Sequence, residues 1–259
     1  MRGKFLLETA ITIDTHEVAE RTYITKFRSP RISPLVAPGQ FIMVSFPETS
    51  DPLLPRAFSV CDATADTVSI LYVAVGRATR KMSRLQPGDQ LVFNGPLGKG
   101  FPEMSRGERI WVALGGSGAA LVPILSRAAV KVSCEVHFFY GARTKEHLVR
   151  FGEAKSVRYS TDDGSEGFHG NVVELLRNEL GSGAPDKLFG CGPTPMLAGM
   201  QREFGERIPT YLSVETPMAC GIGFCQGCPV RRSGEGDYYL ACKDGPVFRS
   251  TEIEFEVKS

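Results

Sequence analysis

Four cysteines crowd into one short segment near the C-terminus, and their spacing limits what that part of the chain can become. Cys220, Cys225, Cys228 and Cys242 form the pattern C-x4-C-x2-C-x13-C, which is the ligand spacing of plant-type 2Fe–2S clusters. Three ligands on one loop can surround two irons while a distant fourth closes the site. Glycines between them let the loop turn tightly and aim N–H groups at the sulfurs. We therefore expect a 2Fe–2S cluster on these four cysteines.

A structural zinc ion is the alternative occupant of this segment. Zinc sites usually combine two short C-x2-C pairs or add histidine ligands. Here an x4 spacing precedes the x2 spacing, and no histidine follows the cluster. The pattern therefore favours iron and sulfur over zinc, while the isolated Cys61, Cys134 and Cys191 are expected to be ordinary thiols, with one exception described below.

The remaining composition limits the partners and the location of the chain. The 259 residues carry a formal net charge of +1, which leaves no electrostatic footprint for nucleic acid or an anionic membrane. The apolar runs are too short to span a bilayer, and the first residues lack the apolar core of a signal peptide. Crowded cysteines in a reducing compartment indicate metal binding rather than disulfides. We expect a cytoplasmic protein with no nucleic-acid partner and no membrane insertion.

Residues 1–102 predict an all-β module. Short runs of β-forming residues alternate with turn signals such as Pro38-Gly39 and Pro87-Gly88, and strands at this spacing are typical of a small antiparallel barrel. One short helix is expected near residues 78–85. The strands are expected at residues 8–15, 22–27, 40–45, 57–61, 67–75 and 89–94.

Residues 103–206 predict a parallel α/β sheet, because apolar strands there alternate with helical stretches. Asn171 is a suitable N-cap for the middle helix. From residue 207 to residue 259 the chain is rich in cysteine and glycine and has only short strands. We therefore expect three modules in the order barrel, α/β domain and metal domain. Strands of the α/β domain are expected at residues 109–114, 134–140 and 187–190, and helices up to residue 130, at 171–180 and at 194–204.

Candidate flavin-binding residues begin at Arg56, at the start of an expected barrel strand. An Arg can pair bidentately with a diphosphate, and the Ser59 hydroxyl can hydrogen-bond the edge of a flavin ring. Further along, small residues open a short helix whose free N–H groups suit a pyrophosphate. An ordinary strand with one exposed Arg is the alternative. The candidates are Arg56, Ala57, Phe58 and Ser59, followed by Leu71, Tyr72, Val73, Gly76, Ala78 and Thr79.

Candidate residues for a nicotinamide dinucleotide lie in two glycine-rich turns between a strand and a helix. Gly115, Gly116 and Gly118 form the first turn, which is only a partial G-x-G-x-x-G fingerprint because Leu121 stands at the third glycine position. A plain tight turn is the alternative. The second turn contains Cys191, Gly192 and Pro193, and a nicotinamide ring could lie against Cys191. The alternative there is a capped helix start with a buried thiol.

No further chemistry is expected outside these motifs. The acidic turn at residues 161–167 lacks additional metal ligands. The four histidines, at positions 16, 137, 147 and 169, form no catalytic arrangement with a nucleophile. We therefore assign no catalytic residue beyond the cofactors.

In combination, these motifs resemble the electron transfer subunits of the heteromeric, NAD-linked dihydroorotate dehydrogenases, within the ferredoxin reductase-like superfamily. The resemblance covers essentially the whole chain, through residues 56–59, 75–80, 95–101, 161–165, 191–197 and 218–228. It implies FAD on the barrel, NAD(H) on the α/β domain and a C-terminal 2Fe–2S domain. It also implies a hetero-oligomer with an FMN-containing subunit that oxidises dihydroorotate to orotate in pyrimidine biosynthesis.

The chain departs from the family pattern at a few positions, which keeps other assignments open. The family usually has Pro at the position of Ala57 and Gly at the position of Ala78, and its nicotinamide loop is richer in glycine than residues 115–120. A diaphorase-type subunit of a hydrogenase, a sulfite reductase or a ferredoxin–nicotinamide transhydrogenase is one alternative. A zinc-stabilised binding module is another. These motifs do not decide between NAD and NADP.

Overall fold

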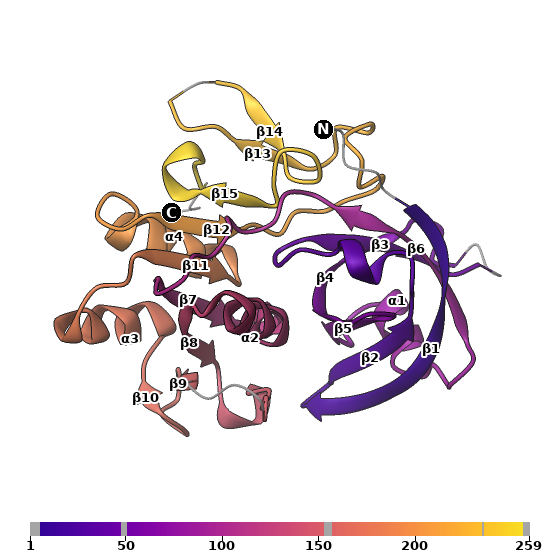
Figure 1. Ribbon diagram of the computed structural model, residues 1–259, viewed down its shortest axis with the longest axis horizontal. Helices are drawn as coiled ribbons and strands as arrows, with labels where there is room; N and C mark the ends of the chain where they lie inside the picture. The colour runs from indigo at the N-terminus through magenta and orange to yellow at the C-terminus, as the bar shows by residue number, and fades with distance from the viewer. Residues whose placement is uncertain (1–5, 48–50, 153–156, 235, 256–259) are drawn as a thin grey trace.

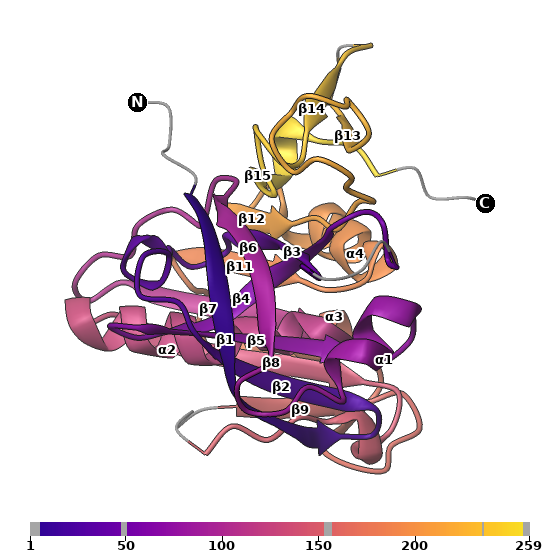
Figure 2. The same ribbon diagram turned by 90° about the vertical axis from the view of Figure 1, so that its right-hand side faces the viewer.

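The computed structural model describes residues 6–47, 51–152, 157–234 and 236–255. A barrel and a helix-flanked sheet lie side by side, and the C-terminal segment packs above both (Figures 1 and 2). This arrangement confirms the expected combination of an antiparallel barrel and a parallel α/β sheet.

Six antiparallel strands close the barrel in the order β1-β2-β5-β4-β3-β6. On β1, buried Glu8, Ala10 and Thr12 alternate with exposed residues, as expected for a strand with one face inside. The short helix α1 (Arg77–Met82) follows β5. The strands are β1 (Leu6–Ala19), β2 (Thr22–Arg28), β3 (Phe41–Ser45), β4 (Arg56–Ala63), β5 (Thr67–Val73) and β6 (Gln90–Leu97).

Strand β3 is buried on both faces, unlike β1. Ile42 and Val44 point into the core that the barrel shares with one face of the sheet. Phe41 and Met43 belong to a second core, on the outer side of the strand. The outer face of β3 is therefore an internal contact between the barrel and the rest of the chain.

A seven-stranded sheet forms the second part, in the order β10-β9-β8-β7-β11-β12-β15. Its strands pair in parallel except for β15, which is antiparallel to β12. Asn171 caps α3 as expected, because its Oδ1 accepts hydrogen bonds from the N–H groups of Val173 and Glu174. The elements are β7 (Arg109–Gly115), α2 (Leu121–Val132), β8 (Glu135–Ala142), β9 (Val157–Thr161), β10 (Phe168–His169), α3 (Val172–Glu179), β11 (Lys187–Cys191), α4 (Thr194–Phe204), β12 (Thr210–Ser213) and β15 (Val247–Arg249).

The two faces of the sheet pack against different parts of the molecule. Val112 and Leu114 of β7 face the core that includes α2 and the barrel. Trp111 and Ala113 face the core beneath α3 and α4. A bidentate ion pair between Arg127 of α2 and Asp62 of β4 also joins the sheet to the barrel, with nitrogen–oxygen distances of 3.0 and 2.8 Å.

The C-terminal segment is divided between the sheet and a small hairpin. β13 (Pro229–Arg231) and β14 (Tyr238–Leu240) pair with each other beside the cysteine loop. β12 and β15 lie beyond residue 206 and nevertheless join the large sheet. The sheet therefore extends across the boundary expected at residue 206.

No helix in the four described ranges is both long and apolar enough to cross a membrane.

Candidate functional site

The four clustered cysteines come together as two pairs. The Cys228 and Cys242 sulfurs lie 3.3 Å apart and are buried. The thiol of Cys225 lies within hydrogen-bonding reach of Cys220, and the N–H of Cys225 is 3.4 Å from the Cys220 sulfur. Cys225 is exposed. Two pairs match a centre with two irons, each of which takes two cysteine ligands.

The loop backbone supplies hydrogen-bond donors to these sulfurs. The N–H of Gly223 points at the Cys242 sulfur over 3.0 Å. Gly221 and Gly223 adopt left-handed φ angles of 72° and 81°, which glycine accepts without steric cost. The bends turn N–H groups toward sulfur, where they stabilise the negative charge of bound thiolates.

Other donors of the loop act on the thiol of Cys220. Partial burial opposes its ionisation, but N–H groups of Cys225, Ile222 and Phe224 outweigh that effect and lower its pKa to about 7. At Cys242 burial dominates and raises the pKa to about 12. Cysteine binds a metal as the thiolate. The Cys220 thiol can ionise near neutral pH. The buried Cys242 thiol needs the positive charge of a bound metal to ionise.

This geometry fits a two-iron cluster better than a single zinc ion. The sulfurs of the cysteine loop stand in two pairs, Cys228 with Cys242 and Cys220 with Cys225. A structural zinc site requires four ligands around one point. The cysteine pairs, with N–H donors around them, are suited to a 2Fe–2S cluster.

The structure also brings the flavin candidates of β4 and β5 together. The Phe58 and Tyr72 rings meet edge to face with centroids 6.0 Å apart. The Tyr72 hydroxyl hydrogen-bonds Thr25 Oγ1 over 2.9 Å, and burial raises the Tyr72 pKa to about 12. Leu71 is buried beside it. Across the ladder with β3, Ala57 pairs with Met43 and Ser59 with Phe41.

The open side of this site lies at the ends of β4 and β5. Arg56 is exposed, and its guanidinium donates to the Leu54 carbonyl over 2.7 Å. A Cβ on Gly76 would find no atom within 4 Å, so the chain leaves room there. Thr79 Oγ1 accepts from the Gly76 N–H over 3.0 Å, while Ala78 is buried on the inner side of α1. An exposed guanidinium at this end of β4 is suited to pair with the diphosphate of FAD.

The two glycine-rich turns lie against each other at the carboxyl ends of β7 and β11. A Cβ on Gly118 would fall 2.1 Å from the Cys191 carbonyl oxygen, and one on Gly192 would fall 3.0 Å from the Gly115 nitrogen. A Cβ on Gly115 would fall 2.9 Å from Pro193 Cδ. These three glycines therefore allow close contact between the turns, a purpose that the sequence motif does not reveal.

Gly116 differs from its neighbours in this turn. Its φ is +53° and a Cβ there would meet nothing within 4 Å, so it faces open space. The segment Gly116–Ala120 forms a 3-10 turn, and α2 begins only at Leu121. The glycine-rich turn therefore leads into a 3-10 turn before the expected helix begins. Crevices beyond the carboxyl ends of parallel strands are where α/β sheets bind nucleotides.

Cys191 is the last residue of β11, at the second glycine turn. It is only 2% exposed. Burial raises its pKa to about 12, the charge of Glu215 adds to that rise, and a hydrogen bond with Ser213 opposes it. The thiol therefore stays neutral, and it can contact a ring but does not act as a base.

Glu215 is a site residue that the sequence motifs did not indicate. It follows β12, and its Oε1 lies 3.5 Å from Ser117 Oγ in the first glycine turn. Its side chain reaches the surface, but neighbouring atoms desolvate the carboxyl and raise its pKa. Its position depends on the parallel pairing of β12 with β11, which no local pattern reports.

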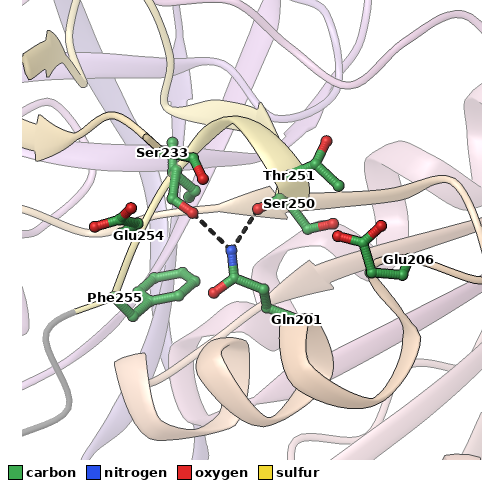
Figure 3. A pocket seen from close by; sticks show the side chains of 9 residues that line it. Gln201, Glu206, Ser233, Ser250, Thr251, Glu254 and Phe255 are labelled. Atoms are coloured by element: carbon green, nitrogen blue, oxygen red, sulfur yellow. Dashed lines mark hydrogen bonds between the residues drawn. The ribbon is translucent and has the colours of Figure 1, made fainter. Parts of the chain in front are cut away.

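A separate hollow of about 410 Å³ lies between α4 and the C-terminal segment, away from all three sites. Figure 3 shows the Gln201 side chain in its floor. The Gln201 amide donates to the carbonyls of Ser250 and Ile253, the latter over 2.7 Å. The hollow contains none of the candidate residues, and its hydrogen bonds fasten the C-terminal segment to α4.

Comparison with known proteins places the chain. The model of the iron–sulfur cluster binding domain of dihydroorotate dehydrogenase B matches residues 215–254. The electron transfer subunit of dihydroorotate dehydrogenase B (NAD(+)) from Desulforamulus reducens is 35% identical over 256 residues, covering 95% of this chain and 98% of that protein. The subunit of the same name from Listeria monocytogenes is 34% identical over 258 residues, covering 96% of this chain and 100% of that protein.

Solved structures share the fold of the chain. A chain of the NADH-dependent reduced ferredoxin-NADP oxidoreductase, described for flavin-based electron bifurcation, superposes with a TM-score of 0.83 at 27% identity. The match covers 98% of this chain and 91% of that one. The ferredoxin reductase in carbazole 1,9a-dioxygenase shares the fold, with a TM-score of 0.70 at 21% identity over 82% of this chain and 70% of that one. The resemblance inferred from the motifs is confirmed: the chain belongs to the family of electron transfer subunits of NAD(+)-linked dihydroorotate dehydrogenase B.

Proposed function

We propose that the chain carries electrons between NAD(H), bound at the paired glycine turns, and an FMN-containing catalytic subunit that oxidises dihydroorotate to orotate. FAD on the barrel and a 2Fe–2S cluster on the cysteine loop connect the two ends. Nicotinamide exchanges electrons in pairs as hydride and the cluster exchanges them singly, so a flavin, which does both, belongs between them. In the direction of orotate formation, dihydroorotate gives up two electrons and two protons; NAD⁺ takes up the two electrons with one proton, and the other proton is released.

The observation that supports this proposal most strongly is the arrangement of the cysteine loop. Its ligands stand in two pairs, and backbone N–H groups point at the Cys220 and Cys242 sulfurs. Such a site is suited to a one-electron redox centre, and a flavin can exchange single electrons with it and hydride with a nicotinamide. The barrel and the dinucleotide crevice supply candidate sites for that flavin and for its hydride donor.

The chain's own residues have distinct proposed roles in FAD binding. Arg56 pairs with the diphosphate, and Gly76 leaves space for it beside α1. Ser59 hydrogen-bonds the flavin edge, and Tyr72 with Phe58 forms the apolar wall of the site. Ala57, Leu71, Val73, Ala78 and Thr79 complete this set.

At the sheet, the crevice between the two turns receives NAD(H). Gly116 faces the open space where a pyrophosphate fits, and Gly115, Gly118, Gly192 and Pro193 hold the turns together. Cys191 offers a neutral, buried thiol for the nicotinamide ring to lie against.

The partner docks on the cluster loop in this proposal. Phe224 is 87% exposed and Ile222 is 44% exposed, and both flank the exposed Cys225. Apolar side chains at the surface beside a redox centre suit a protein contact that excludes water. Cytoplasmic location is part of the proposal, because free thiols and a cluster of this kind persist in a reducing compartment.

The test is to purify the chain anaerobically and assay it with and without the FMN subunit. Iron and acid-labile sulfide are expected at about two each per chain, with FAD bound. The isolated chain is expected to oxidise NADH with artificial dyes but not to turn over dihydroorotate. Adding the FMN subunit is expected to restore NAD-linked dihydroorotate oxidation. Stoichiometric zinc without sulfide would overturn the proposal.

A second candidate is a subunit of a nicotinamide–ferredoxin oxidoreductase, favoured by the structural match over nearly the whole chain. The same reconstitution separates the two candidates. Turnover with ferredoxin and none with the FMN subunit and dihydroorotate would support the second candidate.

A further inference from the structure

Met43 links the flavin strand to one bend of the cluster loop, because its backbone pairs with β4 and its side chain lies against Gly221. It is 1% exposed and lies on the outer face of β3, in the same core as Cys228 and Cys242. On one side, its backbone pairs with Ala57 in β4, the strand that begins with Arg56. Directly paired strand residues have Cα atoms about 4.5–5.5 Å apart.

On its other side, Met43 carries the cluster loop. Gly221 follows the ligand Cys220, and a Cβ on Gly221 would fall 2.5 Å from Met43 Cγ and 3.0 Å from Met43 Sδ. It would also fall 3.1 Å from Leu97 Cδ1. The loop backbone therefore rests directly on the Met43 side chain, at a φ of +72° that favours glycine.

We propose that Met43 is a positioning residue for electron transfer: its side chain sets how closely the cluster loop sits to the flavin-binding strand. This inference rests on the proposed function, because it assumes FAD on β4 and a cluster on the loop. The step it governs moves one electron between flavin and cluster, and no bond forms or breaks. Its rate depends on separation and orientation, which the contact between Met43 and Gly221 fixes.

The shape of a methionine side chain fits the space between β3 and Gly221. Its unbranched, polarizable side chain fills irregular gaps, and the glycine opposite leaves a shallow surface to fill. A residue that merely fills the core would affect stability alone. A positioning residue affects the flavin-to-cluster step more than it affects hydride transfer to the flavin.

The test uses the anaerobically purified, cofactor-loaded full chain and four variants. Met43→Ala removes the support, Met43→Leu keeps most of its volume, and Gly221→Ala adds a methyl group against Met43. The double variant Gly221→Ala with Met43→Ala makes room for that methyl group. Met200→Ala is the matched control, because Met200 is fully buried in the same core and also packs on a glycine, Gly190, away from the cysteine loop.

Stopped-flow mixing with NADH measures flavin bleaching and cluster reduction separately, and iron, sulfide and the EPR line shape of the reduced cluster are measured on the same samples. We expect Met43→Ala to slow cluster reduction about tenfold or more, with flavin bleaching unchanged and an altered EPR line shape. Met43→Leu and Met200→Ala are expected to stay near wild type in both steps. Gly221→Ala is expected to slow cluster reduction or lose iron, and the double variant to recover iron content and line shape.

Two results would overturn the inference. One is that Met43→Ala slows cluster reduction no more than Met200→Ala does. The other is that Gly221→Ala behaves like wild type, or is not improved by the second substitution. Failure of the proposed function looks different, because then wild type itself shows no cluster or no flavin bleaching with NADH. If Met43→Ala does not fold, the Met43→Leu and Gly221 variants still decide the outcome.

Discussion

The cysteine loop and the paired glycine turns both depend on glycine, but for different physical reasons. In the loop, Gly221 and Gly223 take left-handed φ angles that turn N–H groups toward sulfur. In the turns, Gly118 and Gly192 have no side chain because the opposite backbone occupies that space. The loop uses glycine for conformation and the turns use it for close approach. Substitutions in the two regions are therefore expected to fail in different ways.

The largest effect is expected from replacing one of the four cysteines proposed to bind the cluster. Cys225→Ser is expected to remove the 2Fe–2S cluster and abolish electron transfer to the partner, while NADH still bleaches the flavin. The measurements are iron and sulfide content, stopped-flow absorbance and the reconstituted assay. Cys134→Ser is the matched control, since this half-buried thiol lies outside the cysteine loop and donates to the carbonyls of Glu108 and Glu135 over 3.1 and 3.9 Å. Rapid transfer to the partner by a folded, cluster-free variant would show that electrons leave from the flavin.

The next largest effect is expected at Gly118, the glycine of the first turn that lies against the opposite backbone. In Gly118→Ala the new methyl group would meet the Cys191 carbonyl oxygen at 2.1 Å. Overpacking of this kind costs roughly 1–3 kcal/mol in unfolding free energy, and the turns are expected to separate and lose NAD(H). Thermal unfolding and an NADH titration measure this, with the cluster intact.

Gly116→Ala is the control in the same turn, because no atom lies within 4 Å of the added Cβ. Only its φ of +53° opposes alanine, which costs roughly 1–2 kcal/mol. The two variants are compared by unfolding, because Gly116 faces the proposed pyrophosphate site. An unchanged unfolding free energy in Gly118→Ala would mean that close approach of the turns is not what Gly118 provides.

These contrasts also explain how far the sequence alone could lead. Local spacing predicted the strand at residues 22–27, and the observed β2 is Thr22–Arg28. It also predicted that the four clustered cysteines come together. The sequence did not predict that Thr210–Ser213 joins the large sheet, because its parallel partner β11 lies in a separate segment of the chain. Glu215 was missed for the same reason. The support of Gly221 by Met43 depends on the barrel and the loop packing together, which no motif encodes.

A smaller effect is expected at the flavin site. Arg56→Ala removes the guanidinium proposed to pair with the FAD diphosphate. Hydrogen bonds to charged groups contribute roughly 1.5–3 kcal/mol, so FAD affinity is expected to fall about tenfold or more. Fluorescence titration of the flavin-free protein measures the dissociation constant. Arg31→Ala is a suitable control, since the Arg31 guanidinium is exposed and donates to the Leu7 carbonyl over 3.2 Å, outside the proposed flavin site. Unchanged FAD affinity would remove Arg56 from the site.

The smallest effect concerns pH. Desolvation raises the pKa of Glu215 above its ordinary 4.5, and the hydrogen bond with Ser117 opposes the rise. The folded state therefore holds this proton more tightly, so its stabilisation is present below pH 4.5 and is lost as pH rises through the raised pKa. Glu215→Gln is expected to flatten the pH dependence of the unfolding free energy in that window, and Ser117→Ala to steepen it. Urea unfolding at several pH values measures both, and an unchanged slope in Glu215→Gln would contradict this assignment.

The most direct test of electron flow through three sites is one stopped-flow experiment on the cofactor-loaded chain mixed anaerobically with NADH. The account predicts that flavin bleaching comes first and cluster reduction follows it, because the cluster receives electrons only through the flavin. In Cys225→Ser the first phase should persist and the second should vanish. Cluster reduction that precedes flavin bleaching, or no bleaching with either NADH or NADPH, would contradict the account.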